Sequence, residues 1–413
     1  MIKMLMRGVA LVTASSVLAL NAGCGSAPER PSFAVSDTNR AQIASANALS
    51  MELGRRLLPG TAENRFFSPL SISMAMGLVL NGAGGDTRSE MLEALQAKGL
   101  SVNELNAGTR ALTDILEHQD PDVAAQIANA AWVQRGIQLK EAYAADLETY
   151  YKAEVQDLDF LDPDAPATVN KWVDKHTRGM IPRLIDSFRP DTVSTLVNAI
   201  YFKGAWSEPF EEDQTQARPF RLPDGKTASV PMMERKGSYA YKKEQAYEVL
   251  QLPYGEGEWR MTIVLPGEPG GLDALLPQLM SNPESWRAGL ASARGVVRLP
   301  RFTIESKLGL EETLRQLGMK TAFDPEKADF SGMAEEGALF YLSEVIHQAR
   351  IVVDESGTEA AAATAAMVAG SAEPAKPFEF TADRPFFFAI EEGETGAIVF
   401  LGAVRNPAAS DGN

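Results

Sequence analysis

The chain has 413 residues, of which 45% are hydrophobic and 23% charged, and this composition excludes an intrinsically disordered protein. Its formal net charge of −16 repels phosphate backbones, so we expect no nucleic acid partner. The single cysteine, Cys24, excludes an internal disulfide, and no interior linker or repeat divides the sequence into separate domains.

The first 23 residues have the pattern of an export signal. Lys3 and Arg7 precede an apolar run at residues 8–20, which is too short to span a bilayer comfortably. We therefore interpret residues 1–23 as a signal peptide and expect the mature protein to be exported.

The tetrapeptide Asn-Ala-Gly-Cys at residues 21–24 resembles a bacterial lipoprotein cleavage box, in which Cys24 becomes the lipidated first residue. Asn21 stands where an apolar residue is usual, so secretion with an unmodified cysteine remains the alternative. Residues 24–38 are interpreted as a polar tether. We expect a lipoprotein of the cell envelope or outer membrane that contacts the membrane only through this lipid.

Hydrophobic periodicity predicts both helices and strands in the body of the chain. Pro69 is placed to open a helix, and Thr87 with Glu90 has the spacing of a capping box. The predicted helices cover residues 39–58, 69–81, 87–97, 139–151, 168–178 and 310–319. The predicted strands cover residues 66–67, 126–134, 193–202, 230–233, 250–254, 261–266 and 299–306.

No common catalytic or ligand-binding motif occurs in the sequence. It has no G-x-S-x-G elbow, no serine followed three residues later by lysine, no H-E-x-x-H or paired-cysteine motif for zinc, and no phosphate-binding G-x-x-x-x-G-K. We therefore expect no enzyme, no cofactor and no metal. His347 falls inside an apolar strand, where a buried imidazole needs hydrogen-bond partners. A catalytic Ser-His pair is the competing interpretation, but no carboxylate motif accompanies it.

The segment at residues 343–376 changes character at Asp354. It begins as a β-branched strand, and residues 357–370 then carry almost nothing larger than Thr or Ala. Composition alone favours a surface helix or a flexible linker. With the period of a strand, however, one face is small and uncharged, so the segment could slide between two existing strands. The residues on that face are Thr358, Ala360, Ala362 and Thr364, and those on the other face are Glu359, Ala361, Ala363 and Ala365.

The sequence ESGTEAAAATAA at residues 355–366 resembles the hinge of inhibitory serpins. Similar motifs follow the order of that family, among them NRFFSPLSISMAMGLVLNGAGGDT at 64–87, LVNAIYFKGAWSEPF at 196–210 and TGAIVFLGAVRNP at 395–407. The resemblance covers residues 39–407 and leaves 408–413 as a C-terminal tail. It implies an α+β serpin fold with a large central β-sheet, additional sheets, about eight or nine helices and an exposed reactive-centre loop.

The resemblance also implies roles for individual residues. The hinge would comprise Glu355, Gly357, Thr358, Glu359, Ala360, Ala361, Ala362, Ala363 and Thr364. The shutter, where the central sheet must part, would comprise Ser68, Ser71, Asn198 and His347, and Trp206 would lie at the breach where insertion begins. The implied activity is suicide inhibition of a serine protease, or of a cysteine protease, by a monomer whose cleaved loop inserts into the central sheet.

The reactive bond is predicted by counting along the loop. Sixteen residues on from Glu355, the bond is Ser371-Ala372, and Met367-Val368 is a second candidate. Neither site has Arg or Lys, so we expect an elastase-like or subtilisin-like target. The alternative is a non-inhibitory serpin that acts as a binding or structural protein of the cell envelope. The small residues of the hinge favour the inhibitor, because non-inhibitory members often carry charged or bulky residues there.

Overall fold

The computed structural model describes residues 37–118, 120, 122–334, 340–343, 345–358 and 377–409. Several predictions lie outside these residues: the signal peptide, Cys24 and the tether up to residue 36, the hinge residues 359–364, and the two candidate reactive bonds, Met367-Val368 and Ser371-Ala372. Within the described part, no helix is both long and apolar enough to cross a membrane.

The described residues form nine α-helices. They are α1 Asp37–Leu57, α2 Pro69–Leu80, α3 Gly85–Ala94, α4 Val102–His118, α5 Glu141–Tyr151, α6 Ala165–His176, α7 Leu272–Ser281, α8 Glu284–Arg287 and α9 Glu311–Gln316. The first begins two residues before the predicted start, inside the predicted tether. Helix α2 is apolar on nearly all sides and is accordingly buried, with the Ser68 hydroxyl accepting the Ser71 N–H at its start.

The strands of the described residues form two sheets. The six-stranded sheet has the order β10 Phe302–Gly309, β11 Ile346–Val353, β12 Gly357–Thr358, β4 Ser194–Ala205, β2 Val123–Gln134 and β3 Glu154–Leu158. The second sheet has the order β1 Arg65–Phe67, β15 Ile398–Val404, β14 Phe386–Glu392, β8 Trp259–Pro266, β7 Tyr247–Tyr254, β6 Thr227–Lys243, β9 Ala291–Pro300 and β13 Phe378–Thr381, with β5 Gln216–Arg221 paired to β6.

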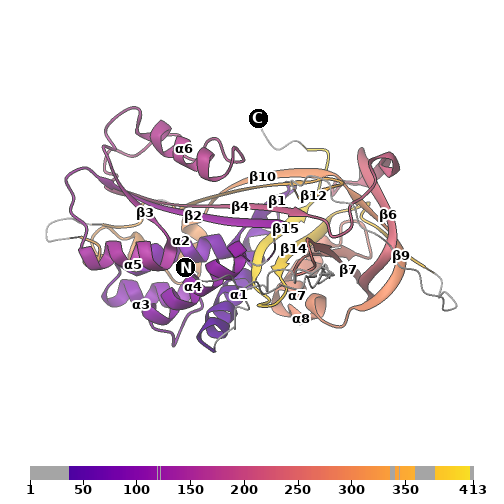
Figure 1. The fold of residues 1–413 in the computed structure, drawn as a ribbon, viewed down its shortest axis with the longest axis horizontal. Coiled ribbons are helices and arrows are strands. Elements are labelled where there is room, and N and C mark those ends of the chain that lie inside the picture. The colour runs from indigo at the N-terminus through magenta and orange to yellow at the C-terminus, as the bar shows by residue number, and fades with distance from the viewer. Residues whose placement is uncertain are drawn as a thin grey trace, which may run out of the picture. The chain divides into compact units, whose positions relative to one another are not determined.

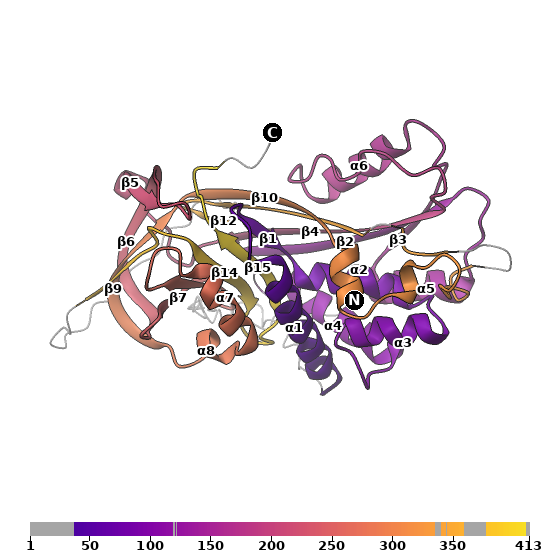
Figure 2. The ribbon, with the colours of Figure 1, turned by 180° about the vertical axis from the view of Figure 1, so that it is seen from behind.

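Helices cover the six-stranded sheet on opposite faces. Helix α6 lies on one face, which we call the outer face, and α2, α4 and α5 lie on the other (Figures 1 and 2). On the outer face Val169, Trp172 and Val173 of α6 form an apolar cluster with Trp132 of β2 and Val197 of β4. The inner face packs against the main core, which contains α2 and the second sheet. This arrangement confirms the α+β class and the large sheet expected from the sequence.

Two local predictions are wrong. Residues 299–306 are not one strand, because the chain passes from one sheet to the other at Arg301, between β9 and β10. Thr87 and Glu90 do not form a capping box, since α3 begins at Gly85 with Gly84 as its N-cap. Both side chains bind a distant segment instead: the Thr87 hydroxyl accepts the Asp329 N–H, and Glu90 accepts the backbone N–H groups of residues 320 and 321.

The six-stranded sheet contains a gap between β4 and β11. In the described part of the chain, only the two residues of β12 stand between these strands. Thr358 pairs with Val353 of β11 and with Gly204 of β4, and Gly357 pairs with Ala205. Strand β4 is fully paired with β2 on its other side, from Ser194 to Gly204. One edge of β4 and one edge of β11 therefore face each other across the gap.

Candidate functional site

The corner where the chain leaves β11 is built on Trp206. This side chain is 4% exposed, and its indole Nε1 donates to the carbonyl of Asp354 at 3.0 Å. Its backbone N–H donates to the carbonyl of Ser356 at 2.9 Å. The ring stacks on Tyr254, with the centroids 4.4 Å apart and the planes 10° apart. Trp206 therefore holds the first residues after β11 against the end of β4.

Tyr254 reaches the hinge directly. Its hydroxyl is 2.8 Å from the hydroxyl of Thr358, which is only 2% exposed. Burial raises the pKa of Tyr254 well above its ordinary value, so this phenol stays neutral and hydrogen-bonded. Thr358 thus points toward the core, as the strand pattern predicted for its face.

Glu355 is a buried carboxylate with two partners. Nε of Arg301 donates to it at 2.6 Å, and the hydroxyl of Thr215 donates to the same oxygen. Burial by itself would raise the pKa of Glu355, but the hydrogen bonds from Arg301 and Thr215 hold this pKa below its ordinary value. The backbone carbonyl of Glu355 also accepts the N–H of Phe210 at 2.8 Å. The charged Glu355 is therefore fixed in place.

A tight turn connects Glu355 to β12. The Asp354 carboxylate accepts the N–H groups of Ser356 and Gly357 at 2.9 and 3.2 Å. Gly357 has a φ of 148°, and a Cβ on it would lie 2.2 Å from the carbonyl oxygen of Gly204. Only glycine fits this position, because any side chain would collide with the backbone of β4.

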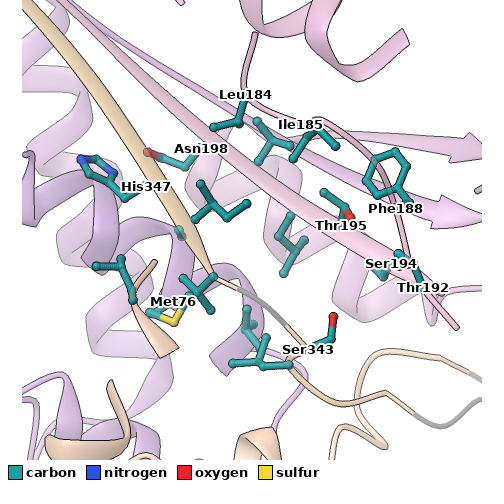
Figure 3. Close-up of a pocket in the computed structure, with 18 of the residues that line it drawn as sticks. Met76, Leu184, Ile185, Phe188, Thr192, Ser194, Thr195, Asn198, Ser343 and His347 are labelled. Atoms are coloured by element: carbon teal, nitrogen blue, oxygen red, sulfur yellow. The ribbon is translucent and has the colours of Figure 1, made fainter. Parts of the chain in front are cut away.

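The four predicted shutter residues lie in one hydrogen-bond chain. Nε2 of His347 accepts the N–H of Ser68 at 3.0 Å, the Ser68 hydroxyl accepts the N–H of Ser71, and the Ser71 hydroxyl donates to the side chain of Asn198. The chain continues through Asn129, which accepts a bond from Asn198 at 2.6 Å. His347 and Asn198 stand on the two strands that border the gap (Figure 3).

This geometry does not suit a catalytic Ser-His pair. The Ser68 hydroxyl donates to the carbonyl of Val399 at 2.7 Å, so its proton is not directed at His347. Nε2 of His347 is already used as an acceptor for a backbone N–H. Among the described residues no carboxylate bonds His347, and burial lowers its pKa to about 4. The imidazole is therefore a neutral member of a polar cluster.

A cavity of about 490 Å³ occupies the gap on the side of His347 and Asn198 away from the hinge (Figure 3). Its walls come from both faces of the sheet. Helix α2 contributes Ile72 and Met76 on the inner face, and residues 184–189 lie on the outer face. The edges of β4 and β11 form the sides. An extended strand would find backbone groups on both sides of this space.

Sequence reasoning missed Tyr254, Arg301 and Thr215. Their partners in the hinge lie 104, 54 and 140 residues away along the chain, so no local pattern could identify them. Trp206 was predicted, and it does contact the hinge. The roles of the shutter, hinge and breach residues remain predictions, although the described ones do come together.

Comparison with known proteins gives consistent results. A family model described as serpin (serine protease inhibitor) matches residues 44–407. Leukocyte elastase inhibitor of Bos taurus is 38% identical over 363 residues, covering 84% of this chain and 94% of the relative. Neuroserpin of Gallus gallus is 34% identical over 359 residues, covering 84% and 87%.

Solved structures extend the likeness to the fold. The thermophilic serpin tengpin in its native state has a TM-score of 0.80 at 28% identity, covering 88% of this chain and 94% of that one. Human thyroxine-binding globulin also has a TM-score of 0.80, at 30% identity, covering 90% and 100%.

Neutral His347 should make the protein sensitive to acid. Its folded-state pKa of about 4 lies below the ordinary value of 6.5, so between these pH values only the unfolded state binds the proton. The free energy of unfolding should therefore fall as the pH falls from 6.5 to 4, by about 1.4 kcal/mol per pH unit from this group. Urea unfolding of wild type and His347→Gln across this range checks it. Other groups titrate in both proteins, so equal slopes would contradict the prediction.

Removing Arg301 should loosen the hinge. Arg301→Met leaves the buried Glu355 carboxylate with Thr215 but without its cation, so we expect the free energy of unfolding to fall by about 1 to 3 kcal/mol. Arg301→Lys keeps the charge and should lose less. Denaturant unfolding at neutral pH measures both changes, and a wild-type midpoint for Arg301→Met would show that the ion pair does not stabilise this corner.

Proposed function

The chain belongs to the serpin family, and on this premise we propose that it is a suicide inhibitor of serine proteases. The partner in this proposal is a protease, and that protease supplies the nucleophile. In the proposed reaction, the serine of the protease attacks a peptide bond in residues 359–376 and forms an acyl-enzyme. The freed part of the loop then enters the gap, and the distorted protease cannot complete hydrolysis.

The observation that carries this proposal is the two-residue strand β12 at the head of the gap. Continuing its register, Thr364 would stand opposite Asn198 on one side and His347 on the other. Ala360 and Ala362 would share the inward face of Thr358, where large side chains would collide with the core. The same register brings residue 368 opposite Ser194, where β4 begins. In this register the gap therefore has room for the whole hinge and for residues up to 368, and its inward face suits the small side chains of the hinge.

The proposed targets are elastase-like or subtilisin-like enzymes, with cleavage at Ser371-Ala372 or at Met367-Val368. Both bonds lack the basic residue that trypsin-like enzymes need. The name of the bovine relative, leukocyte elastase inhibitor, supports the same class. We favour the first because it lies sixteen residues on from Glu355, as in typical inhibitors; in the register of β12 a strand that ends at either residue reaches Thr195 of β4.

A non-inhibitory role is the second candidate. One structural observation supports this role: the fold is similar to that of thyroxine-binding globulin, a serpin whose name states that it binds thyroxine. The small residues of the hinge favour inhibition, because a protein that only binds a ligand does not need small side chains throughout the hinge. Cleavage without trapping would support the second candidate.

The inhibitor should form a covalent adduct. Incubation with pancreatic elastase or subtilisin is expected to give an SDS-stable band at the summed mass, together with a short C-terminal fragment whose N-terminus identifies the reactive bond. The cleaved protein should melt well above the intact one, since the inserted strand adds hydrogen bonds on both edges.

Thr358→Arg is the matched control for this experiment. It introduces a charge at a position that is 2% exposed and opposes Gly204, so the loop should no longer enter the gap. We expect cleavage at the same bond with no adduct. If wild type is also cleaved without an adduct and without a rise in melting temperature, inhibition by insertion is wrong.

We also propose that Cys24 carries the lipid that holds the protein at the cell envelope. Expression of the full chain in bacteria with labelled palmitate should label wild type and leave Cys24→Ser unlabelled. Labelling of neither protein would favour the secreted form.

A further inference from the structure

Strands β6 and β9 of the second sheet present one face to solvent. Arg294, Val296 and Arg298 of β9 point to this face, because side chains alternate along a strand. The residues between them, Val297 and Leu299, point the other way and are buried in the core. The sheet therefore has one buried and one open face here, and the open face can meet another molecule.

Cations predominate on this open face. Glu234 of β6 stands opposite Arg298, Ser238 stands opposite Arg294, and Lys236 lies between them. We call the surface the basic face, and its charged residues are Arg218, Glu234, Lys236, Arg294, Arg298 and Glu379. These four cations and two carboxylates sum to +2, whereas the whole chain has a net charge of −16. The basic face is thus opposite in sign to the rest of the protein.

The carboxylates do not neutralise all of these cations. Glu234 accepts hydrogen bonds from Arg298 at 2.7 Å and from Arg218 at 2.9 Å, so two guanidinium groups share it. The hydrogen bond from Arg298 lowers the pKa of Glu234, which therefore stays ionised. Lys236 and Arg294 are exposed, and among the described residues their side chains form no ion pair. These two charges are available to a partner.

The basic face lies next to the point where the chain returns from the loop. Strand β13 begins at Phe378 and pairs with β9. The ring of Phe378 stacks on Tyr241 of β6, with the centroids 3.9 Å apart. Gly295 leaves room for this ring, since a Cβ there would lie 2.4 Å from it. The start of β13 is therefore fixed beside the basic face.

A protease bound at the preferred reactive bond can reach this face. Ala372 is six residues before Phe378, a distance of at most about 22 Å in a fully extended chain. A standard interface covers about 800 Å² on each partner, which corresponds to a disc about 16 Å in radius. The protease surface around the active site can therefore extend to β13 and to the cations on β9 and β6.

We propose that the basic face is a docking surface for the protease that attacks the loop, and that it favours proteases with an acidic surface beside the active site. The inference rests on the proposed function for the identity of this partner. Opposite charges attract the two proteins and orient them during the encounter, which increases the association rate. The rest of this acidic chain repels the same protease, so the encounter is directed to the strands next to the loop.

Attack on the loop by subtilisin tests the docking surface. One sample of subtilisin is left untreated, and in a second the lysines are succinylated, which replaces each positive charge with a carboxylate. The measured quantity is the rate at which intact full-length protein disappears, so adduct and cleaved protein count together. Each rate is divided by the activity of the same subtilisin sample on a small uncharged peptide.

Lys236→Gln/Arg294→Gln should react with succinylated subtilisin about three to ten times more slowly than wild type at low salt, because it lacks the two available charges. The difference should disappear at about 0.5 M salt, where the charges are screened. Untreated subtilisin should attack wild type and this variant at nearly equal rates.

Lys171→Gln/Lys175→Gln is the matched control, because it removes the same charge from exposed positions on α6. In both views of the ribbon, α6 lies toward the opposite end from β6 and β9 (Figures 1 and 2). The control should react with succinylated subtilisin at nearly the wild-type rate. All variants should keep the wild-type melting temperature.

Equal rates for wild type and Lys236→Gln/Arg294→Gln with succinylated subtilisin would overturn the docking surface. An equal loss in the α6 control would also overturn it, because only net charge would then matter. So would an equal loss with untreated subtilisin, because the substitutions would then act on the loop itself. If the loop is attacked with the expected charge dependence but no adduct forms, the docking surface stands and the inhibitory function fails. An adduct without this charge dependence has the opposite meaning.

Discussion

The buried carboxylate of Glu355 is the interaction on which the arrangement of the hinge depends. A charge in this position is stable only because Arg301 and Thr215 both bond it, and this fixes the point at which the chain leaves β11. The turn that follows is equally restricted, since Gly357 lies against the backbone of Gly204. The fixed carboxylate and the tight turn together direct Thr358 into the sheet, between β11 and β4.

The rest of the gap combines a polar cluster with a cavity whose walls are both polar and apolar. The cluster carries no net charge, and its hydrogen bonds connect two strands and the start of a helix. Its members are Ser68, Ser71, Asn198 and His347. A neutral cluster can exchange hydrogen-bond partners at low cost when strands move apart, whereas an ion pair at this depth would resist separation. The cavity beyond it leaves about 490 Å³ open between the edges of β4 and β11. The gap therefore combines three features: the unpaired edges of β4 and β11, a cavity between them, and a polar cluster that can exchange hydrogen-bond partners.

Many of the helices and strands, and part of the candidate site, could be predicted because local sequence patterns determine them. The periodicity of residues 39–58 and the apolar strands located most elements, and the hinge was predicted from the resemblance of residues 355–366 to inhibitory serpins. His347 was recognisable as an imidazole in an apolar strand. Glu355 could not be assigned its partners, because Arg301 and Thr215 are brought to it only by the packing of two sheets.

The errors have the same origin. Residues 299–306 carry Pro300, which was the available signal of a break, yet their apolar character favours a single strand. Thr87 and Glu90 have capping-box spacing, but tertiary partners at Asp329 and Thr321 take up their hydrogen-bonding groups. Because Arg301 occupies the one-residue junction between β9 and β10, it belongs mechanically to both sheets at once. A shear of one sheet against the other would therefore pull on Glu355 through Arg301, and so reach the point where the chain leaves β11.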